Sequence, residues 1–319
     1  MAASKVSGRK LKLAVPDLIS NSYFPAAAAV ELGFFAREGL DVSLELIFPV
    51  SKCYEALRDG VIDFVGGAAH AVLAAFPDWR GAKLIAAQAQ GMYWFLVMRA
   101  DLGARRGDLD VVEGKRIGAA PWVEMGLRQL LIEAGYDLAR DGIEIVGIPP
   151  NPIIGPNFGL GAAKALEEGR IDGFWANGMG AEIAVTGGIG TVVLDIRRGD
   201  GPEGSFGYTF ASIAATDRLI AEEPETVAAV VRAIVATQKA LKADVALVTE
   251  VGRKLFPPRE ADLIAGIVAR DLPYYDASIA RETVSHLNKF CRARQLLQGN
   301  PAFEAVVEYT LAPLWIAGL

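Results

Sequence analysis

The sequence is poor in cysteine and histidine and has no block of like charge. Its 319 residues include two histidines and two cysteines, Cys53 and Cys291, which stand far apart and outside any CxxC spacing. Neither a zinc site nor a disulfide framework is indicated. The net charge of −6 lacks the basic footprint that nucleic-acid binding requires. We therefore expect no metal, no cofactor and no nucleic-acid partner.

Long hydrophobic runs are missing as well. No stretch has the uninterrupted apolar length of a membrane span. The first twelve residues carry several basic side chains, but the apolar run behind them, residues 13–15, is too short for the core of a secretory signal. We expect a cytoplasmic protein if the chain is native as written, and a periplasmic one if an export signal was removed.

What the sequence does contain is a repeat. The pattern A-L-x-x-G-x-I-D occurs at residues 56–63 and again at 165–172. In each copy a helix is expected to end at a glycine, Gly60 or Gly169, because a left-handed residue commonly closes a helix. A short apolar strand follows each copy. The spacing is too long for a solenoid, so it predicts two similar α/β lobes.

Small residues follow both repeat strands, at 66–70 and at 175–180. In open α/β sheets, ligands lie beyond the carboxyl ends of the strands. Two lobes with facing loops form a cleft, which is a common place for a small-molecule site.

The remaining pattern assigns the chain to the two lobes. The first is expected to contain residues 1–99 and 207–319, and the second residues 100–206. Residues 92–98 form a continuous apolar run that predicts a buried strand before the first crossing, and 207–214 predict a second crossing strand. After residue 223 the pattern is helical, and these helices are expected to cover the first lobe.

Four stretches together resemble the periplasmic-binding-protein superfamily, in particular the NMT1/THI5-like and SsuA/TauA-like solute-binding proteins. They are A-V-E-L-G-F-F-A-R-E-G-L-D-V at 29–42, and residues 56–64, 109–117 and 165–173. The resemblance implies an α/β fold of type II, with two lobes, two crossing strands and a C-terminal helical cladding. It also implies a clamp that closes on a small solute and delivers it to an ABC importer. Some relatives are enzymes on the same clamp.

The candidate ligand residues of the first lobe lie at three strand or helix ends. The loop after the first strand carries two polar residues and an aromatic one, and the family uses this loop for ligand: Asn21, Ser22 and Tyr23. Ser51 and Lys52 open the first repeat helix, where free N–H groups suit an anionic ligand group. Three small residues, Gly67, Ala68 and Ala69, are expected to follow the third strand and to allow close backbone approach.

The second lobe contributes four candidates, Trp122, Glu124, Trp175 and Asn177. The two indoles would stack on a flat ligand, although a buried core position competes with this interpretation for each. Asn177 would hydrogen-bond a polar ligand edge, and Glu124 would bind a cationic or donor group unless it is a solvated helix charge. Sulfonate binders often have hydroxyl residues where this chain has Trp122 and Glu124. His70 is expected to pack rather than to catalyse.

These observations predict a monomeric solute-binding protein, with an ABC permease as its partner. The ligand would be a small, flat, aromatic or heterocyclic molecule, with or without a carboxylate, and the lobes would close about residues 98–101 and 206–208. The alternative is a cytosolic enzyme on the same fold, a decarboxylase or a relative of the pyrimidine synthases. Convergence of His70, Lys52 and Glu124 in a closed cleft would favour the enzyme.

Overall fold

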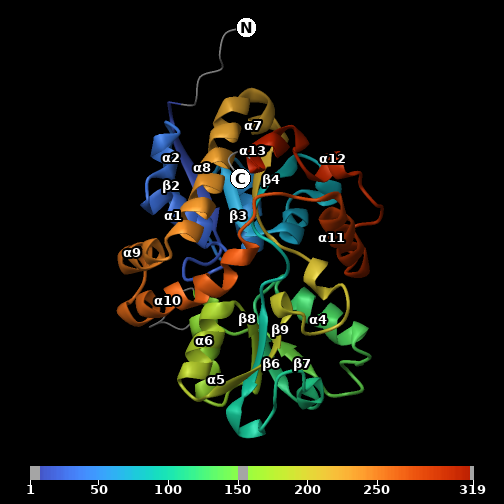
Figure 1. Cartoon of the computed structure of the whole chain (residues 1–319). Coiled ribbons are helices and arrows are strands. Elements are labelled where there is room, and N and C mark those ends of the chain that lie inside the picture. The colour runs from blue at the N-terminus through green and yellow to red at the C-terminus, as the bar shows by residue number, and fades with distance from the viewer. Residues whose placement is uncertain (1–7, 150–156, 317–319) are drawn as a thin grey trace.

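A computed structural model describes residues 8–149 and 157–316, and within these ranges the chain forms two five-stranded sheets, one in each lobe (Figure 1). The strand order is β2-β1-β3-β10-β4 in the first sheet and β7-β6-β8-β5-β9 in the second. In both sheets the first three strands are parallel, and the fourth runs antiparallel to its neighbours. The fourth strand is a crossing strand in each case, β10 or β5. The expected type II architecture is therefore present.

The strands are short and begin or end near glycine or proline. Their bounds are β1 Lys10–Val15, β2 Asp41–Leu46, β3 Phe64–Ala68, β4 Ala82–Ala89, β5 Phe95–Arg99, β6 Arg116–Ala119, β7 Glu144–Val146, β8 Gly173–Ala176, β9 Gly190–Asp195 and β10 Ala211–Thr216.

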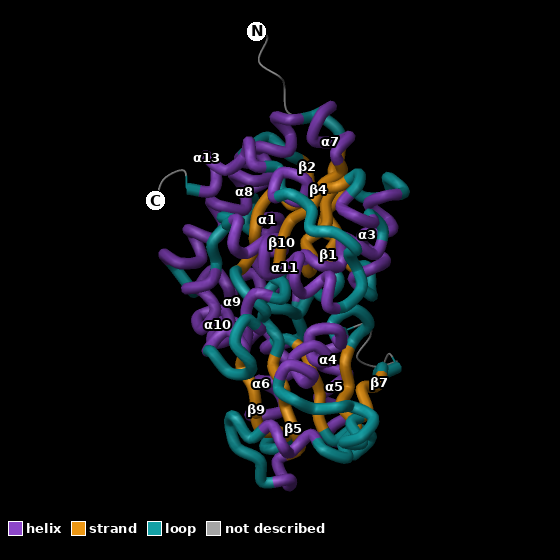
Figure 2. The backbone as a smooth tube through the Cα atoms, turned by 90° about the vertical axis from the view of Figure 1, so that its right-hand side faces the viewer, coloured by secondary structure: helices purple, strands orange, loops and turns teal. Residues whose placement is uncertain are grey.

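Helices surround both sheets (Figure 2). Their bounds are α1 Phe24–Glu31, α2 Phe34–Arg37, α3 Val50–Arg58, α4 Glu124–Glu133, α5 Phe158–Glu167, α6 Gly178–Thr186, α7 Asp217–Glu222, α8 Pro224–Ala243, α9 Ala246–Leu255, α10 Pro258–Asp271, α11 Arg281–Ala293, α12 Phe303–Val306 and α13 Ala312–Trp315. In the part of the chain so described, no helix combines the length and apolarity that a bilayer crossing requires.

The sequence repeat has the same structure in both lobes. Gly60 and Gly169 adopt left-handed backbone angles, with φ of 69° and 68°. The carboxylate of Asp63 then accepts a hydrogen bond from the backbone N–H of Lys12 at 2.8 Å, and that of Asp172 accepts one from Arg116 at 2.9 Å. Each aspartate thus holds the start of the neighbouring parallel strand, β1 or β6. This shared bond explains why the pattern ends in Ile-Asp.

The first crossing lies earlier than the sequence indicated. Strand β5 pairs with β8 and β9, so it belongs to the second sheet although the expected boundary placed it in the first lobe. Hydrophobicity does not mark this boundary, because Met92 to Trp94 are buried between the lobes as fully as β5 is buried in its sheet. The two crossings bond to one another, since Met92 N–H donates to the Phe206 carbonyl at 2.8 Å. Gly91, with φ of 68°, has the Phe206 ring where a Cβ would lie.

Other elements also differ from the expected pattern. Gly67 and Ala68 are part of β3 and do not follow it, because β10 pairs with them and extends the strand. The small-residue stretch expected at 175–180 is not a loop throughout, because Gly178 to Gly180 form the first turn of helix α6, which Asn177 caps. Helix α3 starts at Val50 after Pro49, so Ser51 is not its cap.

The C-terminal helices cover the first sheet, as expected, and also reach the second lobe. Helix α8 packs on α1, α2 and β4, whereas α10 contacts α6 across the gap between the lobes (Figure 1). An ion pair joins the same two helices, from Arg270 to Glu182 at 2.6 Å. The tail therefore contacts both lobes and contributes one ion pair between them.

Candidate functional site

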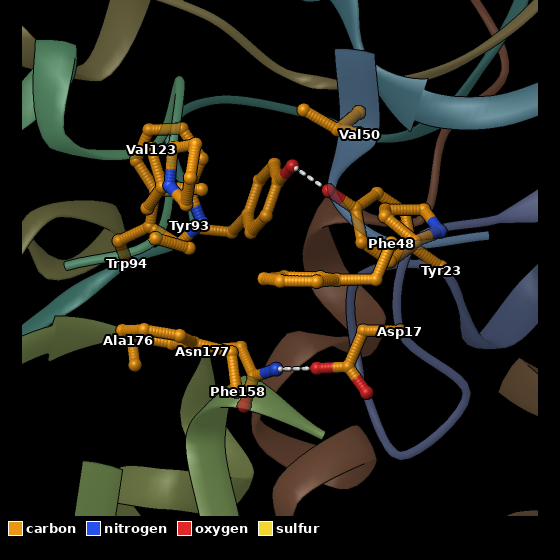
Figure 3. Close-up of a pocket in the computed structure, with 13 residues that line it drawn as sticks. Asp17, Tyr23, Phe48, Val50, Tyr93, Trp94, Val123, Phe158, Ala176 and Asn177 are labelled. Carbon is orange, nitrogen blue, oxygen red and sulfur yellow. Dashed lines mark hydrogen bonds between the residues drawn. The ribbon is translucent and has the colours of Figure 1, made fainter. Parts of the chain in front are cut away.

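A cavity lies between the lobes, and about 50 Å³ of it is open to the centre of a water-sized molecule. Figure 3 shows residues that line it, and they come from both sheets and from the first crossing. The lining is mostly apolar and aromatic. Its described residues are Pro16, Asp17, Tyr23, Phe48, Val50, Tyr93, Trp94, Ala120, Pro121, Val123, Phe158, Ala176 and Asn177.

Asp17 is the polar centre of this cavity. It lies two residues after the end of β1, so the strand end carries its carboxylate into the cleft, where Figure 3 shows it opposite Asn177. Its Oδ2 accepts from Asn177 Nδ2 at 2.6 Å, and its Oδ1 accepts from the Ile19 N–H at 3.0 Å and from the Asn157 side-chain amide. Burial raises the pKa of Asp17 to about 6, and the bonds from Ile19 and Asn177 counter this only in part.

The two asparagines that reach Asp17 also cap helices of the second lobe. Asn157 Oδ1 accepts from the Leu160 N–H at 2.8 Å at the start of α5. Asn177 Oδ1 accepts from the Met179 and Gly180 N–H groups at 3.1 and 3.4 Å at the start of α6. Each side chain therefore uses its oxygen within its own lobe and its NH₂ group across the cleft.

Two tyrosines meet on the other side of the cavity. The hydroxyl groups of Tyr23, from the first lobe, and Tyr93, from the crossing, are 2.6 Å apart, with their rings edge to face. Burial raises the pKa of both phenols well above their usual range, so both remain neutral at physiological pH.

A second contact across the cleft involves His70. Its Nε2 donates to the backbone carbonyl of Trp122 at 3.1 Å, which leaves Nδ1 to accept from the Thr209 hydroxyl at 3.0 Å. Burial lowers the pKa of His70 to about 4, so the ring is neutral. Trp122 has φ of 73°, a left-handed conformation that is costly for a bulky residue and that this bond helps to hold.

A buried ion pair ties the second crossing to the tail. Arg197 and Asp271 pair at 2.7 Å with almost no exposure of either side chain, and Arg197 Nε also donates to the Gln90 carbonyl at 3.0 Å. Asp271 accepts a further bond from the amide of Asn21, whose oxygen accepts the Gly178 N–H at 3.2 Å. Both crossings, the tail and the start of α6 thus belong to one network.

Among the residues predicted to bind ligand, Tyr23 and Asn177 line the cavity. Asn21 lies beside it in the network just described. Ser22 is buried next to them, and its hydroxyl has no hydrogen-bond partner among the described residues.

The structure does not bring the other predicted residues to the cavity wall. Val50 lines it where Ser51 and Lys52 were expected, and Lys52 is exposed and paired with Glu55 at 2.6 Å. Gly67, Ala68 and Ala69 are buried in and after β3, where the Ala68 carbonyl accepts from Tyr54.

The candidates of the second lobe other than Asn177 also turn away from the cavity. Trp175 is completely buried in β8, so the core interpretation describes its indole, whereas Trp122 is half-buried and packs against His70. Glu124 starts α4, and burial raises its pKa. His70, Lys52 and Glu124 therefore do not converge in the cleft.

The residues that sequence reasoning missed had weak signals. Asp17 lies two residues after the first strand, and the strand-end rule identifies that loop. Tyr93 and Trp94 were hidden in an apolar run interpreted as strand. Phe48 and Asn157 lie in loops, where aromatic and amide side chains have no periodicity to mark them. In the described part of the chain, no group of three or more His, Cys, Asp or Glu side chains has a metal-binding arrangement.

Comparison with known families decides the affiliation. The NMT1/THI5-like family model matches residues 21–244, which is more than half of the chain. The chain belongs to the NMT1/THI5-like family. No curated protein sequence matches it.

Solved structures with this fold include both binding proteins and an enzyme. A protein of Bordetella bronchiseptica RB50 superposes with a TM-score of 0.75 and 21% identity, over 97% of this chain and 98% of that one. The periplasmic aliphatic sulphonate binding protein SsuA of Escherichia coli gives 0.66 and 12%, over 94% and 92%. A mutant of the desulfurization enzyme DszB, in complex with biphenyl-2-sulfinic acid, gives 0.64 and 15%, over 96% and 99%. At these identities the likeness shows the fold.

Proposed function

We propose that this protein is a solute-binding protein that closes on a small aromatic or heterocyclic molecule between its lobes and presents it to an ABC permease. The observation that supports this most is the cavity itself. Five aromatic side chains from both lobes and the crossing surround it: Tyr23, Phe48, Tyr93, Trp94 and Phe158. Flat rings pack well against such walls because aromatic pairs add stacking and edge contacts to apolar burial.

The closure contacts support a binding role. Asp17 with Asn177, His70 with Trp122, and Arg270 with Glu182 each join one lobe to the other. The first crossing, between β4 and β5, spans residues 90–94, and the second, between β9 and β10, spans residues 196–210. Changes of backbone angles in such connections close two lobes as a hinge. The likeness to a periplasmic sulphonate-binding protein supports import as the purpose and the periplasm as the location.

The enzyme alternative is favoured by one observation, Asp17, because a buried carboxylate with a raised pKa in an aromatic cavity is a candidate general base. The enzyme neighbour DszB shows that this fold can carry chemistry. A binding role accounts better for the residues that line the cavity, because the described ones include no histidine or lysine that could exchange a proton with Asp17.

The test is native mass spectrometry of the freshly purified protein, combined with small-angle scattering before and after denaturation and refolding. We expect a co-purified small molecule with an aromatic chromophore, whose removal increases the radius of gyration and whose return restores it. A co-purified molecule that is converted to a second product on incubation would instead establish the enzyme.

A matched pair of variants locates the site. Val123→Trp places an indole at the cavity wall, and we expect it to abolish solute binding. Val185→Trp makes the same change on the exposed side of α6 and should bind as the parent chain does. Retained binding in Val123→Trp would place the solute outside this cavity.

A further inference from the structure

A second cavity lies between α10 and the helices α5 and α6 of the second lobe, on the side of the molecule where α10 lies next to α6 (Figure 1). About 200 Å³ of it is open to the centre of a water-sized molecule, against about 50 Å³ in the cleft cavity. The described residues that line it are Leu160, Ala163, Lys164, Glu167, Ile183, Gly187, Ile189, Arg259 and Glu260. None of these residues lines the cleft cavity, so the two cavities are separate.

The walls of this cavity combine aliphatic and charged side chains. The lining residues of α5 recur at intervals of three and four, from Leu160 to Glu167, so they share one face of that helix. Ile183 in α6 and Ile189 just after it add apolar side chains that are half-buried. The first turn of α10 supplies the remaining wall.

Glu260 contributes to this cavity a buried carboxylate without a partner. The residue exposes 9% of its surface, and within the described part of the chain no hydrogen bond or ion pair reaches its side chain. A glutamate at the third position of a helix commonly accepts a bond from the backbone N–H of the N-cap residue. Here the N-cap residue is Pro257, which has no N–H. A buried carboxylate without a donor costs free energy, so Glu260 is an acceptor that a ligand in the cavity would satisfy.

The other charges of the cavity are directed elsewhere. Lys164 pairs with Glu167 at 2.8 Å and with Glu168 at 3.9 Å. The hydrogen bond from Lys164 and, less strongly, the charge of Arg259 lower the pKa of Glu167. Arg259 does not face Glu260, because adjacent positions of a helix point in different directions. The two cations of the described lining therefore act on Glu167 and leave Glu260 without a counter-charge.

We propose that this cavity binds a small aliphatic ammonium, whose N–H groups donate to the Glu260 carboxylate and whose alkyl group packs on Leu160, Ile183 and Ile189. A protonated amine supplies the opposite charge and several N–H donors at once. An alcohol of the same shape supplies a single donor and no charge, and a carboxylate adds repulsion. The proposal does not depend on which solute the cleft binds.

Three probes with the same alkyl group test the proposal: 3-methylbutylamine, 3-methylbutan-1-ol and 3-methylbutanoate, which are cationic, neutral and anionic at neutral pH. Isothermal titration calorimetry of the wild-type chain should give affinities in that order. The difference between a charge-assisted and a neutral hydrogen bond predicts about 5- to 10-fold tighter binding of the amine than of the alcohol. In Glu260→Gln, which keeps the shape of the side chain, that preference should fall below about twofold.

Two further variants locate the amine. Asp262→Asn is the matched control, because it removes a carboxylate from the exposed side of the same helix, outside the cavity lining. It should keep the wild-type ranking, with each affinity within about twofold. Val123→Trp alters the wall of the cleft cavity and should also bind the amine as the wild-type chain does.

Loss of amine binding in Val123→Trp would assign the amine to the cleft and overturn the proposal. Absence of amine binding, equal affinities for the three probes, or a preference for the amine that survives in Glu260→Gln would overturn it as well. The wild-type ranking and Val123→Trp decide the matter even if Glu260→Gln does not fold. Each of these results leaves the proposed function of the cleft standing, because that function is tested with an aromatic solute.

Discussion

The two lobes have the same scaffold and different cleft chemistry. In each, a helix ends at a left-handed glycine, and an aspartate carboxylate holds the N–H of the neighbouring strand, Asp63 for β1 and Asp172 for β6. At the cleft the likeness ends. The second lobe caps α5 and α6 with asparagine side chains and leaves α4 without a side-chain cap, whereas no side chain caps α1 or α3 in the first. The first lobe instead contributes the carboxylate that those asparagines reach.

This comparison distinguishes the residues that stabilise each lobe from the residues that join the two lobes. The repeated Ile-Asp unit lies at the ends of the sheets away from the cleft, and it keeps strand pairing in register. The cleft residues are free to differ because no strand pairing depends on them. Two lobes of one design can therefore be complementary, with a carboxylate on one and amide donors on the other.

The largest expected effect concerns the cores. Phe64 in β3 and Phe174 in β8 are both completely buried. Replacing either with alanine should lower the free energy of unfolding by about 3–5 kcal/mol, because a cavity replaces the ring. The core between the second sheet and α5 and α6 is the smaller, so Phe174→Ala should expose that lobe selectively. Urea titration measures the loss, and amide hydrogen exchange locates it.

Uniformly faster exchange in both lobes of Phe174→Ala would contradict separate cores. It would mean that the lobes unfold as one unit, with the cross-lobe contacts as strong as the packing within each sheet.

The next effect is a dependence of lobe closure on pH. Acidification favours closure through Asp17 and opposes it through His70. The closed cleft raises the pKa of Asp17 from 3.8 to about 6. If the open form restores the ordinary value, closure is favoured below about pH 4 and loses about 3 kcal/mol as the pH rises through about 6. The pKa of His70 is instead lowered from 6.5 to about 4. Its contribution is present above about pH 6.5 and is lost as the pH falls through about 4.

Variants separate the two titrations. The other titratable groups that face Asp17, Tyr23 and Tyr93, do not ionise in this range because burial raises the pKa of both phenols. Asp17→Asn should therefore open on acidification, and His70→Gln should close, in small-angle scattering of the ligand-free protein between about pH 4 and pH 7. Closure of Asp17→Asn at low pH would show that another group takes up the proton.

The shared bond of the repeat gives a smaller effect of equal size in both lobes. Asp63→Ala and Asp172→Ala each remove a carboxylate acceptor from a strand N–H, which should cost about 1.5–3 kcal/mol. The matched control is Asp41→Ala at an exposed position of β2, which should change stability by less than about 0.5 kcal/mol. Urea midpoints measure all three. A large effect at one repeat aspartate and none at the other would break the structural equivalence of the lobes.

The smallest effect tests the difference in capping. Asn157→Ala and Asn177→Ala should each cost about 1 kcal/mol in thermal unfolding, since a helix start loses its cap. Ser51→Ala should be nearly neutral, because α3 begins after Pro49 without a side-chain cap. A cost at Ser51 equal to that at Asn177 would contradict the asymmetry.

Sequence by itself determined the two lobes, because the repeat encodes local structure. The glycine with positive φ ends a helix locally, and the same pattern folds the same way twice. It also identified the loop of Asn21 and Tyr23 and the position of Asn177, since strand ends are visible in the pattern of apolar residues.

Only the tertiary structure decided which side chains face the cleft. Trp175 and Ala176 are neighbours in β8, yet the indole is buried in the core and the methyl group lines the cavity, because successive side chains of a strand point to opposite faces. Asn157 and Asn177 are each more than a hundred residues from Asp17 in the sequence. They reach its carboxylate only because the two lobes lie against one another. Burial between the lobes then raises the pKa of Asp17, and this burial depends on both lobes.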